Sequence, residues 1–378
     1  MPLSARALNR ATLARQLLLR REPLTVADTL RRVVSLQAQE PASPYLALWN
    51  RIEGFDAAEL DRAFVAHEVV KGTSIRITLH AVLASDHGPF QEAMLPTLRA
   101  SRLNDDRFRV AGLTVAQVDA LLPEALGHLA MPRSNAEMEA WFDERLGVLE
   151  RPGIWWAMRT YAPVVHAPTG GPWSFGPRPV YVAARDQERL GDPEAALPHL
   201  VRRYLEGFGP ATVADIAQFG MLTRPRVRAA IESLGDAVVT LEGPGREPLL
   251  DVAGGLLADE DTPSPPRLLG MWDEILLAHA DRSRVIPEAV RKAVIRQNGD
   301  VLPTLLVDGY VAGLWRPVDD GIEASAFAAL DEDTWEALDG EARRLRAFLA
   351  DRDPTVYRRY GHWWSKPLPP ATVRILGR

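Results

Sequence analysis

The chain has 378 residues, of which 47% are hydrophobic and 25% are charged, and at roughly 150 residues per domain this length predicts two or three globular domains. The absence of cysteine excludes disulfide scaffolds, thiolate metal sites and a cysteine nucleophile. No run of about 18 apolar residues occurs, and arginines interrupt the apolar N-terminal stretch, so we expect no membrane span, no secretory signal and a cytoplasmic location.

The net charge is −6, but the basic residues are unevenly distributed along the chain. Residues 1–35 contain seven arginines against two acids, and residues 356–378 contain five basic residues and no acid. Acidic residues are concentrated instead between 319 and 341. This asymmetry predicts a one-sided basic surface on a protein that is acidic overall.

Three predicted helix starts share the sequence Thr-Val-Ala, at 25–28, 114–117 and 212–215. Each places a threonine at the N-cap with a polar residue three positions later, which is a capping box or close to one. The first copy leads to a strand-like segment at 74–83, and the second leads to a helix capped by Ser134 and then two strands. The third leads through a glycine turn to a second helix and then two short strands.

Helix, turn, helix and hairpin is the element order of a winged helix-turn-helix. The sequence therefore predicts an α+β fold with three tandem winged helix-turn-helix units. The first, with the motif described below, spans 1–110, the second spans 111–190 and the third spans 191–262.

A linker rich in proline and acid, at 259–267, leads into a C-terminal mixed α/β region that we expect at 263–378. Within it, residues 303–318 form two apolar stretches joined by Asp308-Gly309, a strong signal for a β-hairpin. An amphipathic helix and then a basic, aromatic tail follow the hairpin.

Two glutamines stand where the first amphipathic helix should end. Gln37 falls on the same helical stripe as the apolar Leu30, and a buried amide costs about 1–3 kcal/mol if it is left unpaired. Pro41 disfavours helix at the residue before it, so we expect the helix to unwind near 38–40. In extended chain Gln37 and Gln39 share a face. They then either present two amides to one spot or satisfy the backbone at a helix end.

Gln37-Ala38-Gln39 resembles the Gln-X-Gln signature of the AlkZ-type DNA glycosylases, a winged-helix family related to the YcaQ type. The YcaQ branch ends the motif in Asp, whereas this chain has Gln39. The resemblance covers essentially the whole chain. It is carried further by Pro44-Tyr45, Trp49-Asn50-Arg51, GTSIRITLH (72–80), GFGPATVADIAQFGML (207–222), MWDEILLAHADRSRVIP (271–287) and PTLLVDGYVAGLWR (303–316).

The resemblance implies a monofunctional DNA glycosylase that hydrolyses the N-glycosidic bond of bulky N7-alkylpurines, with interstrand crosslinks as a candidate substrate, as in azinomycin resistance. Gln37 and Gln39 would be catalytic. Glutamine does not titrate, but its carbonyl and amide can position water and direct dipoles toward the developing cation. No lysine lies within 30 residues of the motif, so we expect no Schiff-base step.

Other side chains are candidates for DNA contact. The hairpin at 303–318 carries Tyr310, Trp315 and Arg316 and could reach into a DNA groove. Alternatively, it is an ordinary sheet hairpin with Trp315 in the core. The tail at 357–367 could contact the DNA backbone or pack against the last domain. The residues we expect at DNA are Arg51, Arg76, Arg282, Arg284, Tyr310, Trp315 and Arg316.

The eight histidines show no metal-ligand spacing, so we expect neither a metal nor another cofactor. The expected partner is double-stranded DNA carrying alkylated purines, bound by a monomer that associates with the nucleoid and with no membrane. A non-catalytic winged-helix regulator is the main alternative, because glutamine also reads adenine in the major groove. A second alternative is a family member that acts on small methylated bases.

Overall fold

A six-stranded antiparallel sheet forms the centre of the N-terminal half, with the strand order β1-β3-β2-β5-β6-β4. The computed structural model describes residues 2–147, 153–185, 191–366, 368–369 and 372–378. Strands from the first two predicted units meet in this sheet, because β2 pairs with β5. The strands are β1 (Leu36–Gln37), β2 (Val69–Thr73), β3 (Leu79–Leu83), β4 (Arg133–Ser134), β5 (Val164–His166) and β6 (Val180–Ala183).

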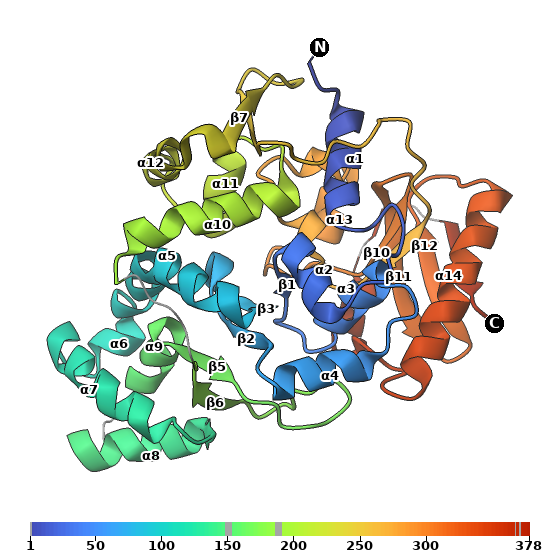
Figure 1. The fold of residues 1–378 in the computed structure, drawn as a ribbon. Coiled ribbons are helices and arrows are strands. Elements are labelled where there is room, and N and C mark those ends of the chain that lie inside the picture. Colours follow the sequence, from blue (N-terminus) through green and yellow to red (C-terminus); the bar gives the residue numbers. More distant parts are fainter. Residues whose placement is uncertain (1, 148–152, 186–190, 367, 370–371) are drawn as a thin grey trace.

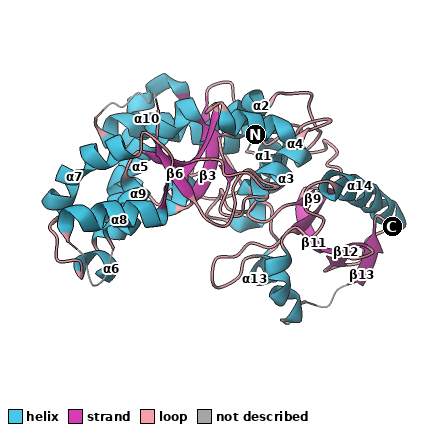
Figure 2. Cartoon of the chain, turned by 90° about the horizontal axis from the view of Figure 1, so that it is seen from below, coloured by secondary structure: helices cyan, strands magenta, loops and turns pink. Residues whose placement is uncertain are grey.

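Helices surround this sheet, with α5 to α10 on the side away from the C-terminal region (Figures 1 and 2). The helix α10 packs on α5 and on α12. The helices are α1 (Ala5–Arg15), α2 (Val26–Val33), α3 (Ser43–Arg51), α4 (Ala57–Val65), α5 (Ala84–Leu103), α6 (Asp106–Arg109), α7 (Val115–His128), α8 (Asn135–Leu146), α9 (Ile154–Tyr161), α10 (Pro193–Phe208), α11 (Val213–Gly220), α12 (Arg224–Leu234), α13 (Arg291–Val294) and α14 (Glu332–Ala350).

A second sheet, ordered β13-β12-β11-β10-β9, builds the C-terminal region and carries α14 against it (Figure 2). A third, two-stranded sheet follows α12. The remaining strands are β7 (Val238–Leu241), β8 (Leu249–Val252), β9 (Arg267–Leu269), β10 (Thr304–Val307), β11 (Tyr310–Val318), β12 (Gly321–Ala326) and β13 (Thr372–Leu376). The short 3₁₀ helices are η1 (Ile75–Ile77), η2 (Gly235–Ala237), η3 (Glu274–Leu276), η4 (Arg282–Arg284), η5 (Glu288–Val290) and η6 (Arg358–Ser365).

The predicted local signals are confirmed. Thr25, Thr114 and Thr212 are N-caps whose hydroxyls accept from the backbone N–H three residues later. Asp308 and Gly309 have φ of 47° and 81° and join β10 to β11, which is the left-handed backbone that a tight hairpin turn requires. The mixed α/β composition is also as expected.

Two hydrophobic clusters stabilise the fold. One joins α2 to α4 with the C-terminal sheet and α14, so the two ends of the chain share a core. The other lies among α5 to α12 and the central sheet. Trp363 and Trp364 of the tail pack against the first cluster, which confirms the packing alternative for the tail. No helix among the described residues is long and apolar enough to cross a membrane.

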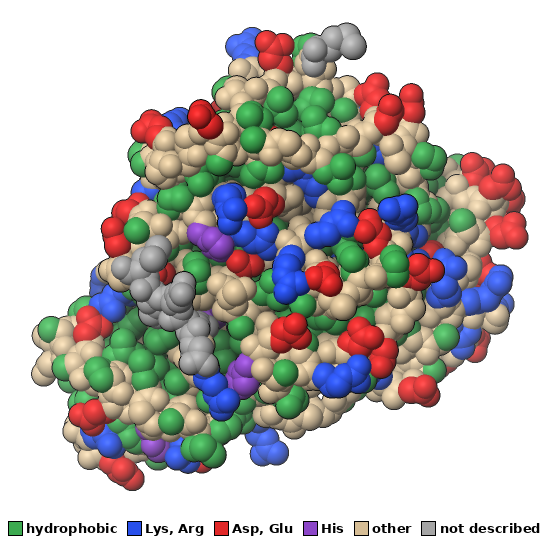
Figure 3. All heavy atoms as spheres, viewed as in Figure 1, with side chains coloured by type: hydrophobic (Ala, Val, Ile, Leu, Met, Phe, Trp, Pro, Cys, Tyr) green, Lys and Arg blue, Asp and Glu red, His purple; other side chains and the backbone are tan. Residues whose placement is uncertain are grey.

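The expected basic surface does not form from the N-terminal arginines. All seven are ion-paired, in several cases with acids from distant parts of the chain: Arg6 and Arg10 with Asp308, and Arg15 with Asp251. Arg10 and Arg15 are buried. The face in Figure 3 accordingly shows cations and acids interspersed. The prediction was wrong for this segment because folding brings opposite charges together that the sequence keeps apart.

Candidate active site

The Gln-X-Gln motif lies at an edge of the central sheet and not at the end of a helix. The helix α2 already ends at Val33, because Val34 adopts a left-handed φ of 76°. The chain then pairs with β3, with Leu36 opposite Ala81 and Gln37 opposite His80. The helical stripe on which Gln37 was placed is therefore wrong, and extended backbone is found at Gln37, whereas Gln39 lies in a bend.

The two glutamines differ in their surroundings. Gln37 is 5% exposed, and its side-chain oxygen accepts a hydrogen bond of 2.9 Å from the backbone N–H of Gln39. The Gln39 side chain is exposed. Gln37 satisfies a backbone N–H group, as one alternative expected, whereas the Gln39 side chain faces outward, as the other alternative expected for both glutamines. Gln37 thus fixes the bend that presents Gln39.

Gln39 lies at the rim of an open pocket of about 330 Å³ between the central sheet and helices α5 and α9. Strands β2, β3, β5 and β6 contribute one wall, and the two helices contribute the other. None of the described residues that line it is acidic. They are Gln39, Thr73, Ile77, Leu79, Arg102, Asn135, Trp156, Arg159, Thr160, His166, Pro179 and Tyr181.

A buried lysine lies close to the motif in space, although it is 32 residues away in sequence. Lys71 on β2 is 4% exposed, with its ammonium 4.5 Å from the centre of the Phe175 ring. Burial lowers the pKa of Lys71 to about 8, against the attraction of Glu40, and burial also raises the pKa of Glu40. Sequence distance was therefore a poor guide, because β3 pairs with both β1 and β2 and so brings Lys71 within one strand of the motif. The sequence pattern of the strand that contains Lys71 gave no indication that this lysine lies near the motif.

A buried cluster of charged residues is connected to the motif through His80, the strand partner of Gln37. His80, the partner of Gln37 across the strands, lies with Nε2 2.9 Å from the Glu274 carboxylate. Arg76 also donates to Glu274, at 2.8 Å, and its guanidinium lies over Phe219. Despite full burial, the attraction of Arg76 and the hydrogen bond with His80 lower the pKa of Glu274 to about 2. Arg76 thus serves the interior of the fold as an ion-pair partner.

The Glu274 cluster should make stability depend on pH. The carboxyl has a pKa of about 2 in the folded protein against an ordinary 4.5. As the pH falls, the Glu274 carboxylate is therefore protonated in the unfolded chain before it is protonated in the folded protein. The contribution of this carboxylate to the free energy of unfolding is complete above pH 4.5 and is lost as the pH falls toward 2. Urea unfolding of Glu274→Gln should show a shallower loss over that window than the parent. Exposed Glu336→Gln is the control, and equal slopes for all three proteins would contradict the assignment.

Comparison with known proteins decides the family. A family model described as "DNA glycosylase AlkZ-like" matches residues 30–348. The chain belongs to this family. It is 27% identical over 354 residues to the interstrand DNA cross-link repair glycosylase of Streptomyces sahachiroi, covering 88% of this chain and 92% of that protein. It also resembles the solved structure of the Streptomyces sahachiroi DNA glycosylase AlkZ, with a TM-score of 0.79, 22% identity, and coverage of 94% and 99% of the two chains.

As an AlkZ-like DNA glycosylase, the protein has DNA as its substrate, yet two residues expected at DNA are enclosed. Arg51 is 0% exposed and pairs with Asp273 through two hydrogen bonds of 2.8 Å. Trp315 is 0% exposed and donates its indole N–H to the carbonyl of Leu269. Neither side chain reaches the surface in this structure, which contradicts the predicted contact of Arg51 and of Trp315 with DNA. Both residues stabilise the interior instead.

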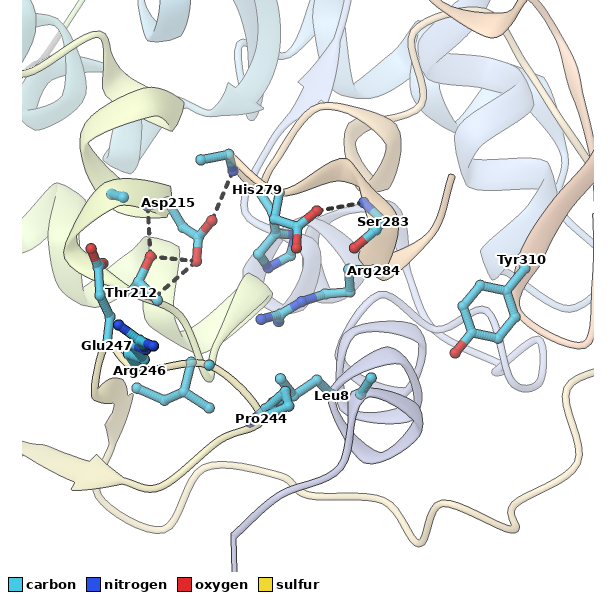
Figure 4. Close-up of a pocket in the computed structure, with 16 residues that line it drawn as sticks. Leu8, Thr212, Asp215, Pro244, Arg246, Glu247, His279, Ser283, Arg284 and Tyr310 are labelled. Atoms are coloured by element: carbon cyan, nitrogen blue, oxygen red, sulfur yellow. Dashed lines mark hydrogen bonds between the residues drawn. The ribbon is translucent and has the colours of Figure 1, made fainter. Parts of the chain in front are cut away.

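The remaining candidates are not among the residues that line the Gln39 pocket. Arg284 and Tyr310 line a second pocket of about 310 Å³, on whose far side Thr212 and Asp215 lie (Figure 4). Arg284 donates to the Pro210 carbonyl at 2.8 Å, and Arg282 donates to the carbonyls of the segment before it. In the C-terminal sheet, Arg316 pairs with Glu323 at 2.8 Å. These arginines are all partly exposed.

Proposed function

We propose that this AlkZ-like glycosylase hydrolyses the N-glycosidic bond of bulky N7-alkylpurines in double-stranded DNA, including interstrand crosslinks. The observation that carries the proposal is the exposed Gln39 side chain at a pocket whose lining, in the part of the chain that the structure describes, contains no acidic residue. The name of the Streptomyces sahachiroi relative, an interstrand DNA cross-link repair glycosylase, supports the crosslink substrate.

The chemistry suits a labile cationic lesion. Alkylation at N7 places positive charge on the purine, so the base departs readily and leaves an oxocarbenium-like sugar. The Gln39 carbonyl would orient the attacking water and direct its dipole toward that cation. Gln37 would act by holding the Gln39 backbone through the 2.9 Å hydrogen bond. His166 at the same pocket is an unsuitable proton acceptor, because burial, followed by the charge of Lys71, keeps its pKa well below the usual range.

The scaffold for this reaction is proposed to contain three winged-helix units within 1–110, 111–190 and 191–262, ahead of the region 263–378. The third unit has the clearest support: α11 and α12 are followed directly by the β7–β8 hairpin. We further propose that the protein acts as a monomer. The partly exposed residues proposed as further DNA contacts are Arg76, Arg282, Arg284, Tyr310 and Arg316.

The proposal is tested with duplexes that carry either a bulky N7-guanine adduct or N7-methylguanine. Abasic products are measured as alkali-labile breaks at several salt concentrations. We expect breaks with the bulky adduct, and fewer with the methylated base. Preferential release of N7-methylguanine would assign the protein to small lesions instead. Salt-sensitive binding without any breaks would overturn the catalytic proposal.

A further inference from the structure

Two arginines at the Gln39 pocket differ from most arginines of this protein. Arg102 on α5 and Arg159 on α9 both line the pocket and are partly buried. Within the described ranges, no carboxylate forms an ion pair with either guanidinium. By contrast, Arg51, Arg76 and the N-terminal arginines are all paired with acids. Among the described residues, the pocket therefore contains two guanidinium groups that have no carboxylate in an ion pair with them.

Neutral groups hold both guanidiniums in place. Arg102 donates through Nε to the Thr160 hydroxyl at 2.9 Å. Arg159 donates through Nη1 to the Asn135 side-chain oxygen at 2.6 Å and to the Tyr181 hydroxyl at 3.2 Å. These contacts orient the side chains but bring no negative charge. Each guanidinium has five N–H donors, so several remain for a further acceptor.

An aromatic ring adds to this support. The guanidinium carbon of Arg102 lies 4.6 Å from the centre of the Trp156 ring, and that of Arg107 lies 3.9 Å from it. Trp156, Arg159 and Thr160 are spaced i, i+3 and i+4 on α9, so they share one helical face. The helix thus presents an arginine and both supports of the other arginine to the same pocket.

Bringing these cations together has an electrostatic cost. Burial, and then the charge of Arg107, lower the pKa of Arg102; the charge of Asp105 opposes this and the charge of Arg159 adds to it. A fold that retains such a cost at a pocket is typical of a binding site, where the ligand supplies the missing charge. Planar guanidinium groups bind phosphate oxygens with two parallel hydrogen bonds, which favours a phosphate as that ligand.

We propose that Arg102 and Arg159 form a site for one phosphodiester of the DNA backbone, next to the damaged nucleotide. This site rests on the proposed function, since its purpose is to place the sugar of that nucleotide beside Gln39. One phosphate held at a fixed distance from the motif would set the position of the glycosidic bond along the strand. The bound oxygens would also complete the hydrogen bonding of both guanidiniums.

The first test measures binding of duplex DNA that contains a tetrahydrofuran abasic analogue, which cannot be excised. Fluorescence anisotropy at several salt concentrations compares the parent with Arg102→Gln, Arg159→Gln and the double variant. The double variant should lose at least tenfold in affinity and lower the log–log salt slope by about 0.9, as for one phosphate no longer neutralised. Arg374→Gln, in an exposed pair with Glu332 on the second sheet, is the matched control.

The second test removes the charge from the DNA. A single methylphosphonate is moved along the phosphates that flank the analogue. At one position it should weaken binding of the parent but not weaken binding of the double variant further. Additive losses at every position, or an unchanged salt slope, would overturn the site. If the parent excises no bulky adduct, the proposed function fails. The non-additive effect of the methylphosphonate and the double variant on binding still decides whether the two arginines hold a phosphate.

Discussion

Replacing Gln39 by alanine is expected to lower the excision rate of a bulky N7-guanine adduct by about 10²–10³-fold, as for loss of one dipole that stabilises a transition-state charge. Because the side chain is exposed at the pocket, its removal leaves no buried group without a partner. The unfolding midpoint should therefore stay close to that of the parent. Single-turnover kinetics, with alkali-labile breaks as the product, measure the rate.

The controls for this prediction use other glutamines. Gln297→Ala removes an exposed glutamine far along the chain from the motif and should leave the rate unchanged. Gln37→Met keeps the length of the side chain but removes the acceptor for the Gln39 N–H, so it should slow excision and also lower stability. Parental rates in Gln39→Ala would contradict the proposed role of this residue.

Replacing Asp273 by alanine should destabilise the protein by about 3–5 kcal/mol, because it leaves the Arg51 guanidinium buried without its partner. Both side chains are enclosed, at 0% and 1% exposure, and are joined by two hydrogen bonds of 2.8 Å. Denaturant unfolding, followed by circular dichroism, gives the change in the free energy of unfolding.

Two comparisons separate the buried charge from other causes. Glu332→Ala breaks an exposed pair with Arg374 and should change stability little. The double variant Arg51→Met, Asp273→Leu removes both charges and should recover much of the loss. If Asp273→Ala lowers the free energy of unfolding no more than Glu332→Ala does, the buried pair of Arg51 and Asp273 does not stabilise the fold as proposed.

The candidate site was predictable only in part. The motif Gln37-Ala38-Gln39 is contiguous, so a resemblance in sequence could identify it. The partners of the motif come from distant segments: Lys71 reaches it through strand pairing, and Arg102 and Arg159 through the packing of α5 on α9. Nothing in the residues around Arg102 distinguishes it from the other arginines. Its position at the Gln39 pocket, with no ion-paired carboxylate within the described ranges, does so, and that is a property of the folded structure.

The seven arginines of residues 1–35 also show that charge in the sequence does not predict which arginines are paired in the fold. Their density suggested a basic surface, yet Arg10 pairs with Asp308 and Arg15 with Asp251, more than 200 residues away. Charge counts along the chain therefore predicted neither which cations are neutralised nor which remain available for DNA.

By itself the sequence determined the helix starts, the hairpin and the family. These depend on interactions within a few residues, such as the Thr212 hydroxyl with the Asp215 N–H or the left-handed turn at Asp308-Gly309, and local backbone chemistry sets them. Tertiary structure alone decided which polar groups are buried, which charges are paired and what surrounds Gln39. Burial and Coulomb interactions depend on distance in space, which long-range strand pairing and helix packing determine.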